Sequence, residues 1–246
     1  MSSEGGSEKI PKPIVAKSVE KPKPALAFDL EGTLVDLERF HQMAFEHVAA
    51  QLGLQFGQGE FHAFVGAGDE AIAKEIARLG DLSNFKLDPK AIRTAKTEVY
   101  RDMLHAHPIV PREGAGEYLE RAKIIGGNLV LASLTPDKDA ERILTGSHLK
   151  PFFTFILTES DVQKKKPDPE VYQKAAKLRG VVNPNMLVHE DSPVGVASGK
   201  AAGSPVAAFP VHENLKFEPK PDAIYMGWKN LAPEEVIDEI FKSRTP

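Results

Sequence analysis

The chain has 246 residues, 41% of them hydrophobic and 27% charged, with a formal net charge of -4 and no cysteine. This balance is typical of a globular protein large enough for one domain with an insertion, and it excludes disulfides, thiolate chemistry and a strongly basic nucleic-acid surface. No apolar run is long enough to span a membrane. We expect a cytoplasmic monomer or weak dimer without membrane or nucleic-acid partners.

The first 24 residues differ in composition from the rest of the chain. They open with Ser, Gly and Glu and then alternate Lys and Pro, as in Lys21-Pro22-Lys23-Pro24. Such a segment has too little apolar surface to offset the entropy lost on ordering it. We predict that residues 1–24 form a disordered tail, with a tether for an acidic partner as the alternative role.

A buried strand is predicted over 25–28, where an apolar run stops at Asp29. Apolar residues at helical spacing follow over 37–52, and residues 59–107 carry two further helical faces and no strand pattern. A helical block between strand and helix elements is typical of an inserted domain. The predicted domains are a helical cap, 37–107, and a core made of 25–36 and 108–246.

Alternation of strands and helices resumes after the helical block. Short apolar runs bounded by turn residues predict buried strands, and amphipathic segments between them predict helices. This alternation predicts an α/β fold, a doubly wound parallel sheet with right-handed crossovers. The predicted strands are 128–133, 155–157, 186–188, 206–209 and 223–226, and the predicted helices are 136–144, 169–179, 193–202 and 234–241.

Several predicted strands end at polar residues. The carboxyl ends of parallel strands meet at one edge of the sheet, so these side chains are expected to converge there. Clustered carboxylates repel one another unless a cation joins them, and oxygen ligands without cysteine favour Mg²⁺ over Zn²⁺. A lysine and a hydroxyl beside such a site suit a phosphoryl group. The residues that follow strands are Asp29, Glu31, Ser133, Glu190 and Asp191, and Lys166 lies between Ser133 and Glu190 in the sequence, just before a predicted helix.

These groups resemble the four motifs of the haloacid dehalogenase superfamily, in its phosphatase and phosphomutase branch with a helical cap after the first strand. The resemblance covers nearly all of 25–241, and it is specific because four separated motifs stand in the right order. The matching segments are Asp29-Leu30-Glu31-Gly32-Thr33, Ser133, Lys166 before Pro167-Asp168-Pro169, and Glu190-Asp191-Ser192 followed by Gly195.

The resemblance implies a Mg²⁺-dependent hydrolase of a small phosphate monoester, sugar-like or nucleotide-like. Asp29 would be the nucleophile that forms an aspartyl-phosphate. Ser133 and Lys166 would bind the phosphate oxygens. Position 31 would protonate the leaving group and then activate water. The implied Mg²⁺ ligands are the carboxylates of Asp29, Glu190 and Asp191 and the main-chain carbonyl of Glu31.

Glu31 departs from the family pattern, which places aspartate at this position. The acid is retained but lies one methylene further out, and a displacement of about 1 Å can cost roughly a hundredfold in rate. We expect a retained acid/base at Glu31. The alternative is a catalytically weak member that binds a phosphorylated ligand.

The cap is expected to contact the substrate through His41 and through the loop from Gly66 to Asp69. His41 stands where sugar-phosphate mutases of this branch carry a histidine, and a packing role is the alternative for it. The segment 65–69 contains no arginine to bind a second phosphate, and Asp69 would repel one. These features favour a phosphatase over the alternative, a phosphomutase of the β-phosphoglucomutase type.

Overall fold

The computed structural model describes residues 24–64, 68–83 and 86–242. Six strands form one parallel sheet in the order β3-β2-β1-β4-β5-β6, which confirms the predicted α/β fold. Residues 1–23 of the predicted tail lie outside the described ranges. The strands are β1 (Ala25–Phe28), β2 (Leu129–Ala132), β3 (Phe153–Leu157), β4 (Met186–Glu190), β5 (Val206–Ala208) and β6 (Ala223–Ile224).

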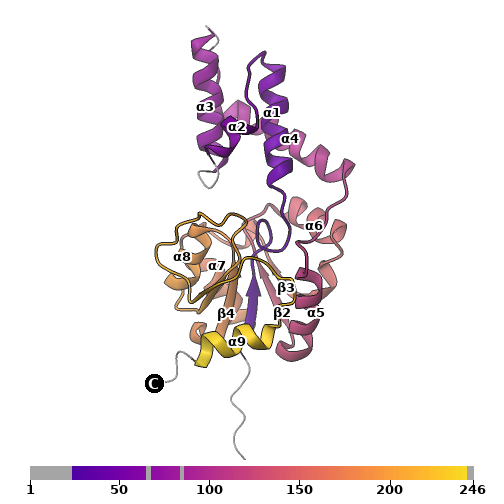
Figure 1. The fold of residues 1–246 in the computed structure, drawn as a ribbon, viewed down its shortest axis with the longest axis vertical. Helices are drawn as coiled ribbons and strands as arrows, with labels where there is room; N and C mark the ends of the chain where they lie inside the picture. Colours follow the sequence, from indigo (N-terminus) through magenta and orange to yellow (C-terminus); the bar gives the residue numbers. More distant parts are fainter. Residues whose placement is uncertain (1–23, 65–67, 84–85, 243–246) are drawn as a thin grey trace, which may run out of the picture.

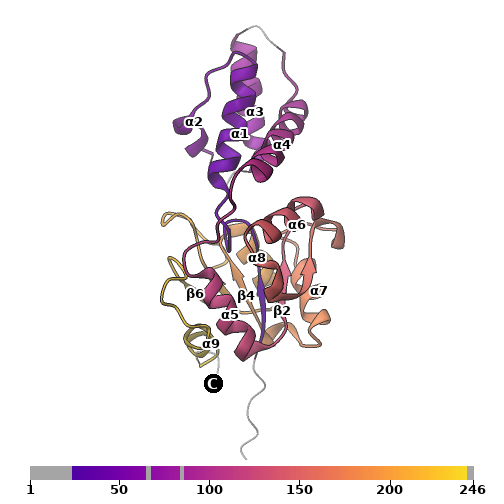
Figure 2. The ribbon, with the colours of Figure 1, turned by 90° about the vertical axis from the view of Figure 1, so that its right-hand side faces the viewer.

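Helices cover both faces of the sheet (Figures 1 and 2). Leu26 and Phe28 of β1 belong to the apolar cluster that includes α5, α6 and α9, whereas Ala25 and Ala27 belong to the cluster with α7 and α8. Side chains alternate along a strand, so β1 is apolar at every position because both of its faces are buried. These helices are α5 (Ala115–Gly126), α6 (Asp137–Gly146), α7 (Glu170–Leu178), α8 (Pro193–Ala201) and α9 (Pro233–Lys242).

In the described part of the chain between β1 and α5, four helices form a separate body beyond one end of the sheet (Figures 1 and 2). They enclose their own apolar core, which includes Phe45, Ile76 and Ile92. They occupy the region proposed as the cap, residues 37–107. They are α1 (Glu38–Gln51), α2 (Gln58–His62), α3 (Asp69–Leu82) and α4 (Pro89–Ala106).

Two arginines, Arg101 and Arg142, join α4 of this cap to α6 of the core by hydrogen bonds. The Arg101 guanidinium donates to both carboxylate oxygens of Asp139, at 2.9 and 3.2 Å. Arg142 Nε donates to the Leu104 carbonyl at 2.8 Å, near the end of α4, where helix carbonyls lack partners within the helix. These bonds fix one side of the cap against the core.

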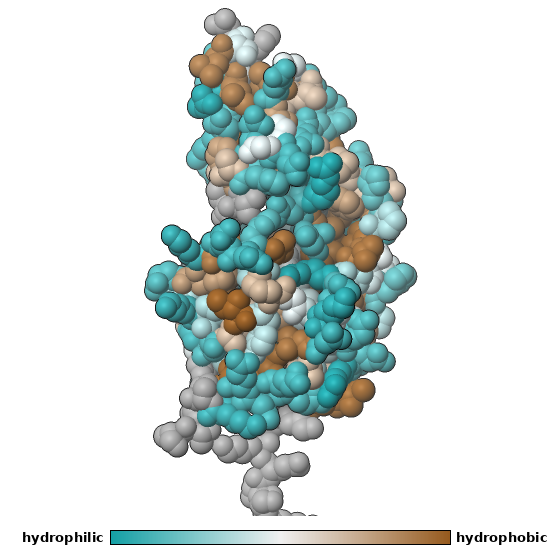
Figure 3. All heavy atoms as spheres, in the orientation of Figure 1, coloured by the Kyte–Doolittle hydropathy of each residue, from teal (hydrophilic) through white to brown (hydrophobic). Residues whose placement is uncertain are grey.

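The surface is mostly hydrophilic on the face drawn in Figure 3, with separate apolar areas. Within the described ranges, no helix combines the length and the apolar character needed to cross a membrane.

Candidate active site

Asp29 follows β1 directly and lies at the carboxyl edge of the sheet. Its main-chain N–H donates to the His189 carbonyl of β4 at 3.0 Å, and only 7% of the residue is exposed. The chain then turns through Gly32, whose φ of +82° favours glycine. A Cβ at Gly32 would lie 2.1 Å from Asp191 Oδ2, so the turn also needs glycine to make room for that carboxylate.

Glu190 is the last residue of β4, the neighbour of β1 in the sheet, and Asp191 follows it directly. One carboxylate oxygen from each of Asp29, Glu190 and Asp191 lies within 4.8 Å of the others. The Thr33 hydroxyl donates to Asp191 Oδ1 at 3.0 Å and orients this carboxylate. Asp29 and the adjacent pair Glu190 and Asp191, which are distant from Asp29 in sequence, therefore share one small volume.

Lys166 provides the positive charge of this cluster. Its Nζ lies 2.6 Å from Asp29 Oδ1, 2.7 Å from Glu190 Oε1 and 3.1 Å from the Ala132 carbonyl. The lysine side chain is 5% exposed. Burial lowers the pKa of its ammonium, but Asp29 and Glu190 outweigh burial, so the pKa stays well above its usual range. Lys166 is therefore held as a cation.

Glu190 differs from the other two acids because both of its oxygens already accept hydrogen bonds. Oε1 accepts from Lys166 and from the Tyr172 hydroxyl, at 2.7 and 2.9 Å. Oε2 accepts from Asp191 N and from the N and Oγ of Ser192, at 3.0, 3.2 and 3.1 Å. The lone pairs of Asp29 and Asp191 are less occupied, so these two offer the more available direct ligands for a cation.

The electrostatics of the cluster fit a divalent cation. Burial raises the pKa of Asp29 to about 7 although Lys166 opposes it. Burial, with repulsion from Glu190 and Asp29, raises the pKa of Asp191 well above its ordinary value. Burial alone would also raise the pKa of Glu190, but Lys166 outweighs it and holds that pKa low. Two buried carboxylates and one half-buried carboxylate beside one ammonium favour an oxygen-bound divalent ion, and Mg²⁺ suits such ligands.

Ser133 follows β2 and belongs to a short chain of hydroxyl groups. It is 2% exposed, and its Oγ lies 3.0 Å from the Thr135 hydroxyl. Thr135 Oγ1 in turn donates to Glu31 Oε1 at 2.6 Å. Ser133 therefore lies at the same edge as Lys166, which contacts the carbonyl of the preceding residue, Ala132.

Glu31 connects the core to the cap. The Tyr100 hydroxyl of α4 donates to its Oε2 at 2.8 Å, and His41 Nε2 of α1 lies 3.1 Å from the same oxygen. Burial alone would raise the pKa of Glu31, but bonds from His41, Thr135 and Tyr100 lower it to about 2. Glu31 is therefore held as a carboxylate in this arrangement.

Lys96 of α4 links the predicted cap residues His41 and Asp69. Its Nζ lies 2.6 Å from Asp69 Oδ2 and 2.6 Å from His41 Nδ1, and it also sits over the Phe45 and Tyr100 rings. An ammonium can only donate, so Nδ1 accepts and Nε2 carries the proton that it shares with Glu31. A polar chain thus runs from the start of α3 to the loop after β1.

Arg112 binds the backbone of the loop after β1. Its Nη1 donates to the carbonyls of Gly32 and Phe209, at 2.6 and 2.5 Å. Its own N–H donates to the Leu34 carbonyl at 2.8 Å, and Trp228 Nε1 donates to the Thr33 carbonyl at 2.9 Å. Four backbone segments are therefore tied together behind Asp191.

The structure brings six of the predicted site residues to the same sheet edge. Asp29, Lys166, Glu190 and Asp191 form one cluster, and Ser133 and Glu31, which Thr135 joins, belong to a polar network beside it. His41 joins this network through Glu31, and Asp69 joins it through Lys96. Gly66 lies outside the described residues.

Sequence reasoning missed Thr135, Lys96, Tyr100 and Arg112. One signal for Lys96 existed, because Ile92, Lys96 and Tyr100 follow one another at helical spacing on the buried face of α4. A lysine in the middle of an apolar face needs a polar partner. Arg112 carried no such signal, because its partners are backbone carbonyls.

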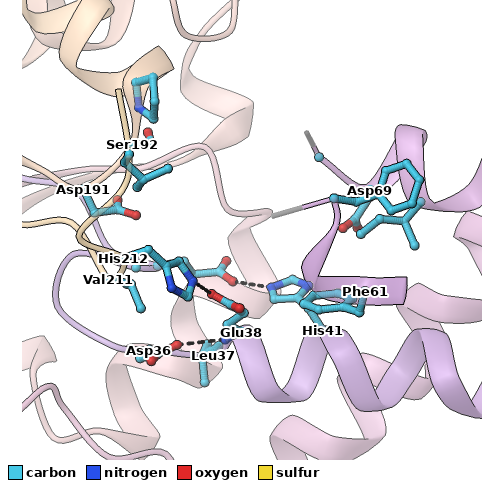
Figure 4. A pocket seen from close by; sticks show the side chains of 17 residues that line it. Asp36, Leu37, Glu38, His41, Phe61, Asp69, Asp191, Ser192, Val211 and His212 are labelled. Carbon is cyan, nitrogen blue, oxygen red and sulfur yellow. Dashed lines mark hydrogen bonds and ion pairs between the residues drawn. The ribbon is translucent and has the colours of Figure 1, made fainter. Parts of the chain in front are cut away.

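A cleft of about 260 Å³ opens beside the network, between cap and core (Figure 4). Asp191, Ser192 and His212 lie on its core side, and Phe61 and Asp69 lie on its cap side. The cleft therefore gives a small molecule access to the carboxylates.

Comparisons with known proteins agree with this architecture. A family model described as haloacid dehalogenase-like hydrolase matches residues 26–209. Protein CbbY of Rhodobacter capsulatus is 31% identical over 194 residues, which are 76% of this chain and 85% of that protein. A phosphorylated carbohydrates phosphatase of Thermotoga maritima is 31% identical over 183 residues, which are 73% of this chain and 81% of that protein.

A solved structure of CbbY from Rhodobacter sphaeroides in complex with phosphate has the same fold. It superposes with a TM-score of 0.68 at 24% identity, covering 85% of this chain and 96% of its own. This likeness bears on the fold alone.

Proposed function

Because this chain belongs to the haloacid dehalogenase-like hydrolase family, we propose that it is a Mg²⁺-dependent phosphatase that acts through an aspartyl-phosphate on Asp29. Its family and its relatives named as phosphatases make it a phosphoric monoester hydrolase. The proposed substrate is a small phosphorylated metabolite, sugar-like or nucleotide-like. The observation that carries the proposal is the contact of Asp29 with Lys166 inside a group of three carboxylates.

Asp29 is the proposed nucleophile. Lys166 occupies Oδ1, whereas Oδ2 has only a 3.5 Å contact with the Thr33 hydroxyl, so a lone pair of the carboxylate stays available. In the first step a bond forms between Asp29 and phosphorus, and the bond from phosphorus to the leaving oxygen breaks. In the second step water attacks phosphorus and restores the Asp29 carboxylate.

The cation would be held by the carboxylates of Asp29 and Asp191 and the main-chain carbonyl of Glu31, with Glu190 completing the acidic set. When bound, it would supply the positive charge that lets a carboxylate approach a phosphate. Lys166 and Ser133 would bind the phosphate oxygens that do not react, and their charge and hydroxyl would stabilise the transition state.

Glu31 is the proposed acid/base. It is held as a carboxylate here, which is the form that accepts a proton from the attacking water. Protonating the leaving oxygen in the first step requires protonated Glu31, which the bonds from Tyr100, His41 and Thr135 oppose. We expect these bonds to rearrange when substrate binds.

A phosphatase screen tests this proposal. Phosphorylated metabolites are incubated with the protein and Mg²⁺, and released phosphate is compared with that from Asp29→Asn. We expect turnover by the native chain and loss of at least a thousandfold in the variant. Equal turnover by both proteins would remove Asp29 from its role.

Two other functions give different results in the same screen. A phosphomutase would need a bisphosphate primer for activity and would release little free phosphate. A binding protein with weak catalysis would turn over no ester, and Glu31→Asp would raise hydrolysis strongly if the native chain is a detuned enzyme. The donors around Glu31 hold the carboxylate that the second step needs as a base, which favours an enzyme over a binding protein. The described residues of the cleft include no lysine or arginine for a second phosphate, which favours a phosphatase over a phosphomutase.

A further inference from the structure

The cleft between cap and core has apolar side chains on both of its walls. Phe61, Phe64 and Ile72 line it from the cap, and Val211 and Leu215 line it from the core. Figure 4 shows Phe61 and Val211 on these opposite sides. A molecule between the walls would therefore place apolar surface against both of them.

The charged groups of the cleft are almost all acidic. Its described lining residues include no lysine or arginine. Both lining histidines already contact a carboxylate: His41 lies 3.1 Å from Glu31, and His212 lies 2.6 Å from Glu38. The lining carboxylates are Glu31, Asp36, Glu38, Asp69 and Asp191.

Lys96 is a cation of the cap next to the cleft, but its ammonium does not line the cleft. Its side chain is 3% exposed, and Asp69 stands between it and the cavity as its ion-pair partner. Its ammonium also contacts His41 and lies over the rings of Phe45 and Tyr100. A second anionic group on a bound molecule would therefore meet the Asp69 carboxylate instead of a free ammonium.

Resting on the proposed function, we infer that the preferred substrate is a phosphate monoester whose leaving group has an apolar face and no second anionic group. The phosphate would bind at Asp29 and Lys166, where positive charge and the cation site are found. The leaving group would lie in the cleft, between apolar walls in a field of acids. A neutral or cationic leaving group with an apolar face fits both the apolar walls and the acidic lining. A bisphosphate or a carboxylated ester would bring a second anion close to the acidic lining.

Three aryl phosphate esters of similar shape test whether a second anionic group on the leaving group lowers kcat/KM. They are phenyl phosphate, 4-carboxyphenyl phosphate and 4-(aminomethyl)phenyl phosphate, each assayed with Mg²⁺. We expect kcat/KM for the carboxylated ester to be roughly tenfold below that for phenyl phosphate, because like charges repel across the cleft. The cationic ester is expected to equal or exceed phenyl phosphate.

Variants assign the effect to the cleft. Asp36 is exposed, and its described hydrogen bond is to the main-chain N–H of Glu38. Asp36→Asn should reduce the ratio of kcat/KM for phenyl phosphate to kcat/KM for the carboxylated ester about threefold. Asp81 lies at the far end of α3 and does not line the cleft, so Asp81→Asn removes the same charge but should leave this ratio unchanged.

The apolar wall is tested at Leu215, a half-buried residue of the core side. Leu215→Ser should lower kcat/KM for phenyl phosphate about fivefold and leave that for methyl phosphate unchanged, because only the ring reaches the wall. Circular dichroism and melting temperature check that the variant is folded.

The outcomes separate the two proposals. If no ester is hydrolysed, or Asp29→Asn is as active as the native chain, the proposed function is wrong. If hydrolysis depends on Asp29 but the carboxylated ester is preferred, or Asp36→Asn and Asp81→Asn behave alike, the phosphatase stands and the substrate inference is wrong.

Discussion

The Tyr100 hydroxyl donates a 2.8 Å hydrogen bond to Glu31 Oε2, so a cap helix and the loop after β1 share one carboxylate. Thr135 Oγ1 donates to the other oxygen of the same carboxylate at 2.6 Å. The longer side chain of glutamate thus lies in a site whose donors come from both bodies of the protein. This relationship bears directly on the departure of position 31 from the family pattern.

Glu31→Gln keeps the length of the side chain but removes its acid/base capacity, so kcat should fall about 100-fold to 10,000-fold. Glu31→Asp keeps the acid but shortens its reach, and we expect a smaller loss of about tenfold to a hundredfold. Steady-state rates with one aryl phosphate and Mg²⁺ measure both. A rise in kcat for Glu31→Asp would contradict the view that the site is built for glutamate.

Arg112→Lys tests the clamp behind the catalytic loop. Lysine lacks the second nitrogen, Nη2, that donates to the Pro210 carbonyl at 3.3 Å, and it lacks the planar group that aims Nη1 at the carbonyls of Gly32 and Phe209. We therefore expect a loss of about 1–3 kcal/mol in the free energy of unfolding. The loop also positions Asp191, so the apparent affinity for Mg²⁺ should fall as well.

Urea denaturation and Mg²⁺ titration followed by melting temperature measure the two effects of Arg112→Lys. Arg78→Lys, in a surface ion pair with Glu75, is the matched control and should change neither quantity appreciably. Unchanged Mg²⁺ affinity in Arg112→Lys would limit the clamp to a structural role.

Removal of the cation should abolish turnover, since the three acids otherwise repel the phosphate. Adding Mg²⁺ at about a hundredfold above its Kd should raise the melting temperature by about 5–10 °C. Asp191→Asn should lose this rise, whereas Asp102→Asn, on the exposed side of α4, should keep it. An equal rise in both variants would place the cation elsewhere.

His189 gives the stability of the fold a defined pH dependence. It stacks on Phe28 and contacts the Tyr118 hydroxyl at 3.0 Å, and burial lowers its pKa from 6.5 to about 3. The unfolded chain therefore binds a proton that the folded chain does not, between pH 6.5 and pH 3. Stability should fall with decreasing pH across this window, by up to about 1.4 kcal/mol per pH unit from this residue.

Urea denaturation between pH 4 and pH 8 measures this slope. His189→Leu should be less stable at pH 8 but lose this part of the slope. Tyr118→Phe removes the same hydrogen bond while keeping the imidazole, so it should lose stability and retain the slope. Equal slopes in native protein and His189→Leu would show that other groups set the pH dependence.

Much of the fold could be predicted because its signals are local. Apolar runs such as Ala25–Phe28 mark buried strands, and their alternation with amphipathic helices defines the parallel sheet. The helix α5 was not among the predicted elements, although Gly114 and Gly127 bound it and Leu119 and Ala122 lie on its buried side. Its charged and exposed positions made the apolar face less evident than that of the other core helices.

By itself, the sequence determined which chemical groups end the strands, since parallel strands place their carboxyl ends at one edge whatever the details of packing. Asp29, Ser133 and Asp191 follow from that rule, whereas Lys166 lies in the loop before α7 and was indicated by the resemblance to the family's motifs. Only the tertiary structure decided that Lys96 turns inward to Asp69, that Tyr100 reaches Glu31 and that Arg112 ties backbone carbonyls together. These contacts join residues 27, 69 and 80 positions apart, respectively, so no local pattern encodes them. The first depends on how α3 and α4 pack within the cap, the second on how the cap docks on the core, and the third on packing within the core.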